Sequence, residues 1–533
     1  MTKVDKSSTG AGDEAYNRND EANIESTGGE RDKSFGESQD QMEEESSNSY
    51  IPEAYEGQPA MAGYITGIED SSQEFPVMTR QRSVIERVQS NYSFFNSKLK
   101  SQRKRLLVQF GFVYLLMAVL ILAIFSIYWG SMVNRGSRLK NLQMLAVIED
   151  DVTVDGISPV IGDSFYQLLQ TPEAKYRGTW NVFNLSEWEA IALRNNRTSL
   201  EEIQLQIHNQ HYWSGLYVKP NASYNWVQAV INGDSSYNVS ENTISNTYET
   251  GRDFMNMNSY VTPAIRLLET WWLDLQSNVS KQLLDYVEDK SVLSSQGSLD
   301  VMTTPMTFIF DDRAPWDDYV LVAPSQVGLI YMIIITFFQF NFFADLHKEV
   351  AMSKLRPHHY YMYRVFSAIL SYFVISLFMG LVSLACQVDF TVTYGKSGFL
   401  VYWMISFLTM IAVGTVNEIM GLLFILFYPP MLGFWLLFWV ICNITPTFTP
   451  LALSAKFFRY GYAMPIHNSY EASKSVFFNV SKGQIGRNIG ILVAWCVLSN
   501  IALVPVLKLF GSTMGKRAAQ AAKEAKEKEL SRD

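Results

Sequence analysis

Cysteine is scarce in this chain of 533 residues: it has three, and all lie inside apolar runs, at Cys386, Cys442 and Cys496. None falls between residues 130 and 318, a mostly polar stretch long enough to form a domain. Such a domain has no disulfide and must be held by its own core. Three dispersed cysteines also exclude the ligand spacing of cysteine-based zinc and iron–sulfur sites.

The short motifs of nucleotide-driven machines and hydrolases are absent as well. Gly395-Lys396-Ser397 has no glycine five residues before it, which excludes a phosphate-binding loop. There is no H-E-x-x-H zinc motif and no G-x-S-x-G nucleophile turn. We therefore expect no enzymatic activity, no cofactor and no metal. The net charge of −9 argues further against a nucleic-acid partner.

The negative charge is concentrated at the N-terminus. Residues 1–76 carry 18 acidic and five basic side chains and contain few aromatic residues. A segment of this composition buries too little apolar surface to offset its chain entropy. We predict that residues 1–79 form a disordered acidic tail in the cytosol. Because this tail lacks the apolar region of a cleavable signal peptide, the first apolar run is expected to act as a signal-anchor.

Long apolar runs are abundant. The first, Leu106–Trp129, has 24 residues without a charge and spans roughly 36 Å as a helix, enough for a hydrocarbon core of about 30 Å. Residues 399–450 contain a single charged residue and fit two spans, with a break at Tyr428-Pro429-Pro430. Six transmembrane helices are predicted, over residues 106–129, 320–343, 365–386, 399–427, 430–450 and 489–510.

Basic residues orient these spans. The juxtamembrane segment 80–105 contains eight basic side chains and Glu86 as its single acidic one. The positive-inside rule places this segment, the N-terminus and the basic loop 344–364 in the cytosol. An even number of spans then places the C-terminal tail, residues 511–533, in the cytosol too.

The loop 451–488 conflicts with this rule, because it is expected outside the cytosol yet is rich in basic residues. These are Lys456, Arg459, Lys474, Lys482 and Arg487. The lengths of the spans and a sequon in the loop outweigh the conflict. Within the loop, Phe457–Tyr470 interleaves aromatic residues with glycine and proline, which favours a broken segment. That segment is either re-entrant, lining a substrate route, or an aromatic anchor at the membrane interface.

Residues 130–318 are predicted to form an α+β domain. Trp213–Val218 and Trp226–Ile231 alternate like strands around a turn at Asn232-Gly233-Asp234. Apolar spacing predicts a helix over Ala264–Val287, and Ser137–Ile148 is expected to continue the first span as a helix. The expected fold class is a polytopic α-helical membrane protein, with six transmembrane helices and an α+β extracytoplasmic domain between the first and second.

Candidate modification sites follow from this orientation. Six N-x-S/T sequons lie in segments expected outside the cytosol, at Asn184, Asn196, Asn221, Asn238, Asn278 and Asn479. On the cytosolic side, Ser83 follows Arg80-Gln81-Arg82 and is a candidate for phosphorylation. A phosphate there would weaken the attraction of the basic segment to anionic lipids, about 1 kcal/mol per charge. Topology alone explains the same basic residues equally well.

Two polar residues inside a span form the candidate intramembrane site. Asn417 and Glu418 lie within the fourth span, where a carboxylate is costly and usually faces a bundle interior or an aqueous cavity. Three explanations stay open: a proton or substrate site, a structural hydrogen bond, or a protonated glutamate near a membrane interface. Gly414 and Gly421 nearby favour close packing of helices.

One pair of histidines in the domain has a spacing worth testing. His208 and His211 lie three residues apart, near Trp213. A metal site or an acid–base pair can use this spacing, but two polar surface residues are the commoner explanation.

The order of one span, a large domain and five further spans is similar to that of the fungal nitrosoguanidine-resistance proteins. Their wider relatives include bacterial phage-infection proteins and the membrane domains of type-2 ABC exporters. The resemblance covers about residues 100–512, and its most specific pieces are Gly215–Ala222, Tyr248–Asp253 and Tyr460–Pro465 with Asn468. None of these pieces is a catalytic motif.

The resemblance implies resistance to toxic compounds such as nitrosoguanidine, by export of small amphipathic molecules or lipids. Membrane lipids and a separate ATPase, pump or flippase subunit are the expected partners, and a homo-oligomer is compatible with the family. The alternative function is a non-transporting regulator or organiser of membrane lipid asymmetry or of a partner pump. Long aromatic-rich spans favour the plasma membrane, with the endoplasmic reticulum membrane as the alternative location.

Overall fold

The structure is a computed structural model that describes residue 95 and residues 97–353 and 355–531. The predicted acidic tail 1–79, most of the basic segment 80–105 and the candidate Ser83 lie outside the described residues. The protein is mostly helical, with one small mixed sheet in the segment that follows the first long helix.

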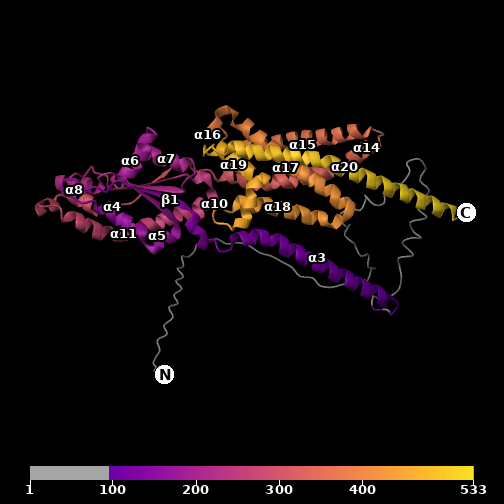
Figure 1. The fold of residues 1–533 in the computed structure, drawn as a ribbon, viewed down its shortest axis with the longest axis horizontal. Helices are drawn as coiled ribbons and strands as arrows, with labels where there is room; N and C mark the ends of the chain where they lie inside the picture. The colour runs from indigo at the N-terminus through magenta and orange to yellow at the C-terminus, as the bar shows by residue number, and fades with distance from the viewer. Residues whose placement is uncertain (1–94, 96, 354, 532–533) are drawn as a thin grey trace, which may run out of the picture. The chain divides into compact units, whose positions relative to one another are not determined.

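Six helical stretches in the described part are long and apolar enough to cross a membrane, which confirms the predicted number of candidate spans. They are Lys100–Met132, Tyr319–Met352, Pro357–Ala385, Thr391–Phe427, Pro429–Phe448 and Ile485–Glu527. Their main helices, labelled in Figure 1, are α3 (Lys100–Met132), α13 (Gly328–Phe342), α15 (Pro357–Ala385), α17 (Gly398–Phe427), α18 (Leu432–Phe448) and α20 (Ile485–Leu530). The helix break falls at Tyr428-Pro429-Pro430, as predicted.

The segment 344–364, predicted as a basic cytosolic loop, is mostly helical, and its place relative to the membrane stays a prediction. Helix α14 covers Ala344–Met352 and α15 begins at Pro357, so Arg364 belongs to a helix of the bundle. Charges and apolar residues mark the span but not the ends of the helix, since a helix can continue beyond the apolar residues of a span. The last predicted span, 489–510, lies within the N-terminal part of α20, which continues to Leu530.

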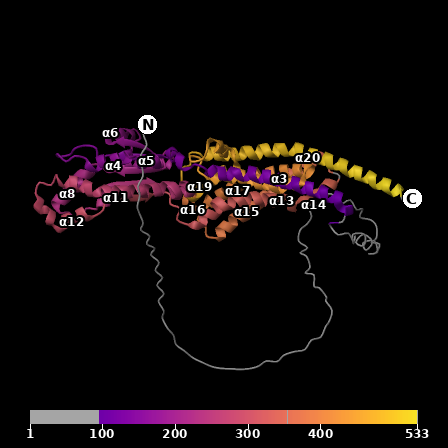
Figure 2. The same cartoon turned by 90° about the horizontal axis from the view of Figure 1, so that it is seen from below.

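Helix α17 is the centre of the bundle and packs against α13, α15, α18 and α20. Two glycines permit this packing, as predicted. A Cβ at Gly414 would lie 2.5 Å from Tyr372 Cζ, and one at Gly421 would lie 2.7 Å from Phe340 Cε1. Helix α3, by contrast, is largely exposed and packs against α18 (Figures 1 and 2).

The domain between α3 and α13 is built on a five-stranded sheet in the order β2-β1-β3-β4-β5. Its strands are β1 (Gln143–Ile148), β2 (Thr179–Asn184), β3 (Ser214–Val218), β4 (Ile244–Tyr248) and β5 (Ile309–Asp312). Strand β1 pairs in parallel with β2 and β3, β3 pairs antiparallel with β4, and β4 pairs in parallel with β5. The sheet is therefore mixed, with three parallel pairs of strands and one antiparallel pair.

Helices cover both faces of this sheet. On one face, Leu216 shares a core with Trp226 and Trp272, which come from α8 and α11. On the other, Val147 packs with Trp188 of α6 and with residues of α7. The helices of the domain are α4 (Val160–Gln170), α5 (Pro172–Arg177), α6 (Leu185–Arg194), α7 (Ser199–His208), α8 (Ala222–Asn232), α9 (Val239–Asn242), α10 (Phe254–Asn256), α11 (Thr262–Leu284) and α12 (Gln296–Thr303).

Two secondary-structure predictions in the domain are wrong and two are confirmed. Ser137–Ile148 does not extend the first span: a 3-10 turn over Gly136–Asn141 leads into strand β1. A strand covered on both faces is a continuous apolar run, which resembles a buried helix. Trp226–Ile231 lies in helix α8, whose left-handed end at Gly233 mimics a hairpin turn. Strand β3 and helix α11 lie where predicted.

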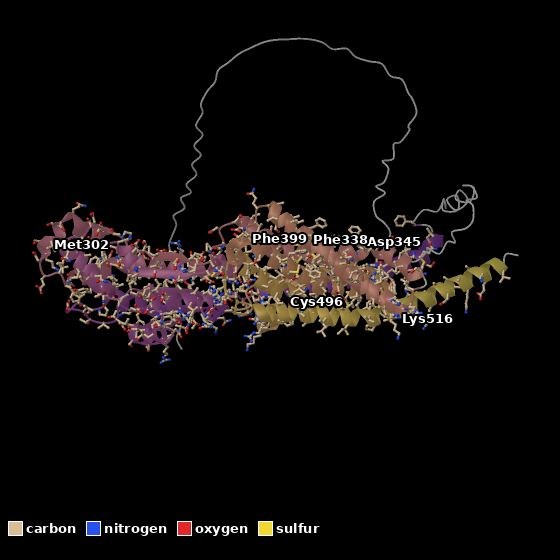
Figure 3. All side chains as sticks on the ribbon, turned by 90° about the horizontal axis from the view of Figure 1, so that it is seen from above. Met302, Phe338, Asp345, Phe399, Cys496 and Lys516 are labelled. Atoms are coloured by element: carbon tan, nitrogen blue, oxygen red, sulfur yellow. The ribbon has the colours of Figure 1, made fainter. Side chains whose placement is uncertain are left out.

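The domain and the bundle share apolar contacts. Trp316, after β5, packs on Phe478 with ring centroids 4.2 Å apart, and Leu453 joins a cluster with Leu142 and Met144 of the domain. We call the end of the bundle near these contacts the domain end. Short elements gather there: α16 (Thr391–Tyr394), the 3-10 helix η10 (Lys456–Ala463) and α19 (Pro465–Phe477). Figure 3 shows Phe399 toward this end and Asp345 and Lys516 toward the opposite one.

Candidate functional site

Asn417 is buried on α17, and both atoms of its amide are bound. Its Nδ2 donates to the carbonyl oxygen of Ile333 at 3.0 Å and to Thr336 Oγ1 at 3.2 Å, both on α13. Its Oδ1 accepts from Trp435 Nε1, on α18, at 3.2 Å. The amide thus joins three helices, which is a structural hydrogen-bonding role.

Glu418 forms an ion pair with Arg364 of α15, and the two side chains are 4% and 3% exposed. The guanidinium Nη2 donates to the carboxylate Oε1. Each charge would be costly alone in the bundle, and each compensates the other. Of the explanations for Asn417 and Glu418, this geometry favours a structural role, because the carboxylate is already paired with a guanidinium. A proton or substrate role for Glu418 stays a prediction.

A polar helix lies buried at the domain end. Helix α19 has the sequence PIHNSYEASKSVF, and every residue except Glu471 is buried. It packs against α17, α18 and α20, and Thr409 Oγ1 of α17 donates to Ser469 Oγ at 2.7 Å. The predicted broken segment is therefore confirmed as two short helices, η10 and α19, that follow each other; whether it re-enters the membrane stays a prediction.

Charges on α19 connect the bundle to the domain. Lys474 Nζ donates to Glu471 Oε1 at 2.8 Å and to the backbone carbonyl oxygen of Arg252 in the domain. Burial acts to raise the pKa of the Glu471 carboxyl, but the charges of Lys474 and His467 outweigh it and hold that pKa below its ordinary value. Burial lowers the pKa of the Arg252 guanidinium to about 10 and raises that of the neighbouring Asp253 carboxyl. This cluster is a joint between domain and bundle.

An apolar groove of about 680 Å³ lies between α17, α20 and η10. Val416 and Ile419 of α17 line one wall, and Ala494, Leu498 and Ala502 of α20 line the other. Its volume is within the range of small-molecule and cofactor pockets.

The end of the groove at η10 is polar. Arg459 and Tyr462 line it there, and Trp495 Nε1 of α20 donates to the carbonyl oxygen of Ala463 at 2.6 Å. That bond fastens η10 to α20. The groove therefore combines apolar walls with one cationic end, the arrangement that an amphipathic molecule requires.

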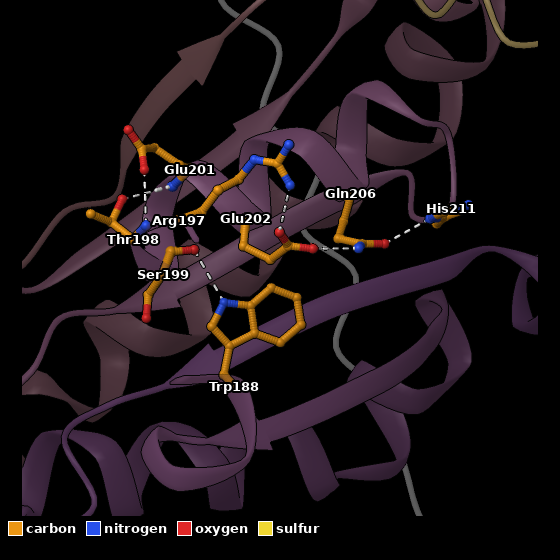
Figure 4. A network of polar contacts seen from close by, with 8 residues as sticks. All are labelled: Trp188, Arg197, Thr198, Ser199, Glu201, Glu202, Gln206 and His211. Atoms are coloured by element: carbon orange, nitrogen blue, oxygen red, sulfur yellow. Dashed lines mark hydrogen bonds and ion pairs between the residues drawn. The ribbon is translucent and has the colours of Figure 1, made fainter. Parts of the chain in front are cut away.

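The two histidines of the domain bind separate partners. His208 Nδ1 lies 2.8 Å from Glu249 Oε1, and this contact raises the pKa of the imidazole. His211 Nδ1 lies 2.6 Å from Gln206 Oε1, whose amide nitrogen in turn donates to buried Glu202 at 2.6 Å (Figure 4). Among the described residues, no group of three or more His, Cys, Asp and Glu side chains is placed to hold a metal ion. The pair fits the polar-surface explanation.

The six candidate glycosylation sites are all exposed. Asn184 caps α6, where its Oδ1 accepts from the Glu187 amide at 2.9 Å, and Asn238 caps α9 in the same way. Asn278 lies within α11. Exposure makes each of them accessible, and use of the sites stays a prediction.

The chain matches one family model over residues 113–501, which is more than half of its length, and the description of that family is "Protein of unknown function (DUF3533)". The chain belongs to the DUF3533 family. The family description names neither nitrosoguanidine nor transport. The resemblance to resistance proteins is therefore supported for the architecture and not for their function.

A relative in Saccharomyces cerevisiae is similar to this DUF3533 chain along most of both proteins. It is an uncharacterized endoplasmic reticulum membrane protein, 33% identical over 438 residues, which is 81% of this chain and 85% of the relative. The description of this relative supports the prediction of a membrane protein. It also fits the alternative location predicted from the sequence, the endoplasmic reticulum membrane. No solved structure matches the chain significantly.

Two features of the site escaped prediction from the sequence. Arg364 was assigned to a loop, although it is the partner of Glu418. The available signal was the position of Arg364, the eighth residue of α15, followed by a mostly apolar remainder of that helix. Helix α19 was predicted only as a broken segment, since its polar composition is typical of an exposed helix rather than a buried one.

Proposed function

We propose that this DUF3533 protein transports small amphipathic molecules or lipids, and that it does so without catalytic chemistry of its own. The observation that supports this proposal is the groove between α17, α20 and η10, with its apolar walls and one cationic end. A lipid-soluble molecule reaches such a groove from within the membrane. Resistance to toxic compounds follows if export removes them, with energy supplied by a separate ATPase or pump.

We further propose that the protein works in the endoplasmic reticulum membrane, with both termini in the cytosol. The relative in Saccharomyces cerevisiae is described as a protein of that membrane. In this orientation the α+β domain and the domain end of the bundle face the lumen.

Reconstitution of the full chain tests transport directly. Purified protein in liposomes is expected to equilibrate a fluorescent phospholipid placed in one leaflet, a downhill movement that needs no ATPase, faster than protein-free liposomes. Ala494→Phe fills the groove and should abolish the gain. Val497→Phe is the matched control, because Val497 lies on the same helix, is 52% exposed and does not line the groove. Equal rates in wild type and Ala494→Phe would contradict transport through this groove.

A second function, a non-transporting organiser of membrane lipids or of a partner pump, is supported by the joint at α19. Lys474, Glu471 and Arg252 connect domain and bundle through buried polar contacts, as a scaffold requires. This function predicts that liposomes containing the pure protein move no lipid, and that cross-linking in cells recovers a pump, flippase or ATPase with the full chain.

A further inference from the structure

The basic residues of the loop 451–488 are not balanced by acidic ones. The loop has five basic residues and one acidic residue, Glu471. Glu471 is already paired with Lys474 at 2.8 Å. Lys482 Nζ lies over the ring of Tyr394, 5.2 Å from its centroid. The positive charge that remains is at the domain end of the bundle, where the positive-inside rule disfavours it, so topology does not explain it.

Two of these cations lie at or beside the groove, one among its lining residues and one over the ring of Tyr462. Arg459 lines the groove together with Tyr462. Arg487, in the first turn of α20, places its guanidinium carbon 5.6 Å from the centre of the Tyr462 ring. Both arginines are exposed, and within the described residues neither forms an ion pair with a carboxylate. The Arg459 guanidinium, which lines the groove, and the Arg487 guanidinium, which lies over Tyr462 and donates to Asn488 Oδ1 at 3.5 Å, therefore both lack a carboxylate partner and can bind an anion at this end of the groove.

The rest of the groove suits a hydrocarbon chain. Its wall on α20 extends from Ile491 to Ala502, which is about 17 Å at 1.5 Å per residue. Apart from Ser499, the side chains that line this wall are apolar or aromatic, Trp495 among them. The hydroxyl of Ser499 is turned to its own helix, where it donates to the Cys496 carbonyl oxygen at 3.4 Å. An acyl chain in the groove therefore meets hydrocarbon along its length.

We propose that the groove binds an anionic membrane phospholipid, with an acyl chain along α17 and α20 and its phosphate at Arg459 and Arg487. Arginine presents a planar fork of donors that binds phosphate oxygens in pairs. A net negative headgroup suits two uncompensated cations, and the surrounding leaflet supplies the lipid. This inference names the lipid class for the proposed transport function and rests on its choice of groove.

Binding is measured separately from transport. Full-length protein in vesicles of phosphatidylcholine with a brominated phosphatidylserine is expected to show quenching of Trp495, taken as the difference between wild type and Trp495→Phe. The Arg459→Gln/Arg487→Gln variant should raise the amount of brominated phosphatidylserine needed for half-maximal quenching about thirtyfold. This is the effect expected from the loss of two charges at the membrane surface. Lys396→Gln, which removes an exposed charge beside α17 but away from the groove lining, should leave it unchanged.

Each outcome decides a different point. Equal quenching by brominated phosphatidylcholine, or full quenching in the double-arginine variant, overturns the anionic-lipid site even if transport occurs. Displacement by a free amphipathic acid but not by phosphatidylserine assigns the groove to a soluble ligand and also overturns it. Selective, arginine-dependent binding without any movement of lipid in liposomes retains the site and rejects transport.

Discussion

Arg364 and Glu418 are 54 positions apart in the chain, and they form an ion pair in the interior of the bundle. Among the described residues, neither side chain forms an ion pair with a further charged group, and the Nε of Arg364 is buried without a hydrogen-bond partner. The pair ties α15 to α17 at the point where α17 also binds α13 and α18 through Asn417. Four helices are therefore held together by two adjacent residues of one helix.

Removing one member of this pair should destabilise the protein. Glu418→Gln leaves the Arg364 guanidinium buried without its counter-charge, a loss of roughly 3–5 kcal/mol. The double variant Arg364→Met/Glu418→Met removes both charges and should recover most of the loss. Thermal unfolding in detergent, followed by size-exclusion chromatography, measures both. Glu349→Gln, at an exposed position on α14, is the control. An active Glu418→Gln protein of wild-type stability would instead show that the pair is dispensable.

The close approach of helices at Gly414 makes a second prediction. Gly414→Ala places a Cβ 2.5 Å from Tyr372 Cζ and 2.9 Å from Thr336 Cβ, so α13 and α15 must move. We expect a loss of about 1–3 kcal/mol in stability. Gly433→Ala in α18 meets no atom within 4 Å and should be neutral or slightly stabilising. Equal unfolding temperatures for the two variants would contradict tight packing at Gly414.

The sequence predicts the features of this fold that depend on local signals, and it misses those that depend on distant parts of the chain. Hydropathy located all six candidate spans, and prolines 429 and 430 located the break between α17 and α18, because both signals are local. The assignment of Trp226–Ile231 failed because alternation over six residues cannot distinguish a strand from a helix buried on more than one side. The sequence pattern leaves that choice open, and the structure shows a helix that ends at Gly233.

The candidate site was predicted only in part for the same reason. Asn417 and Glu418 stand out as polar residues in an apolar run, so their positions were predictable. Their partners Arg364, Ile333 and Trp435 lie on three other helices, and nothing local connects them. The groove is less predictable still, because its lining comes from three separate elements.

The joint at α19 should depend on Lys474. Lys474→Met removes the buried ammonium that binds Glu471 and the carbonyl oxygen of Arg252. The Glu471 carboxylate then lacks its nearest counter-charge, and a loss of roughly 3–5 kcal/mol is expected. Hydrogen exchange should rise in the segment around Arg252 and in α19. Lys482→Met, an exposed residue of the same loop, should leave exchange in both segments unchanged. Protection that persists in Lys474→Met would show that apolar contacts alone hold the joint.

The contact between His208 and Glu249 predicts a pH dependence in the domain. The hydrogen bond to Glu249 raises the pKa of His208 above its ordinary value of 6.5. A raised pKa in the folded state means that the contact stabilises the protein fully below pH 6.5 and that this contribution is lost as pH rises through the folded pKa. The unfolding temperature of the wild type should therefore decline over that interval relative to His208→Gln. Parallel curves for the two proteins would show that the imidazole does not titrate with folding.

The exposed sequons decide the orientation, because glycans are added only on the lumenal side of the membrane. Asn196, in an exposed turn of the domain, and Asn479, exposed in the loop whose charge conflicts with the positive-inside rule, have φ of 53° and 52°. Asn→Gln at each should increase electrophoretic mobility by one glycan, and deglycosylation of the wild type should remove the difference. Asn184→Gln should in addition lose its cap on α6, about 1 kcal/mol in stability.

A protein resident in the endoplasmic reticulum keeps core glycans of uniform size, whereas extended heterogeneous glycans would indicate passage to the plasma membrane. If neither Asn196 nor Asn479 carries a glycan and a cysteine placed beside each is labelled only from the cytosol, the proposed orientation is wrong, and Arg459 and Arg487 face the cytosolic leaflet.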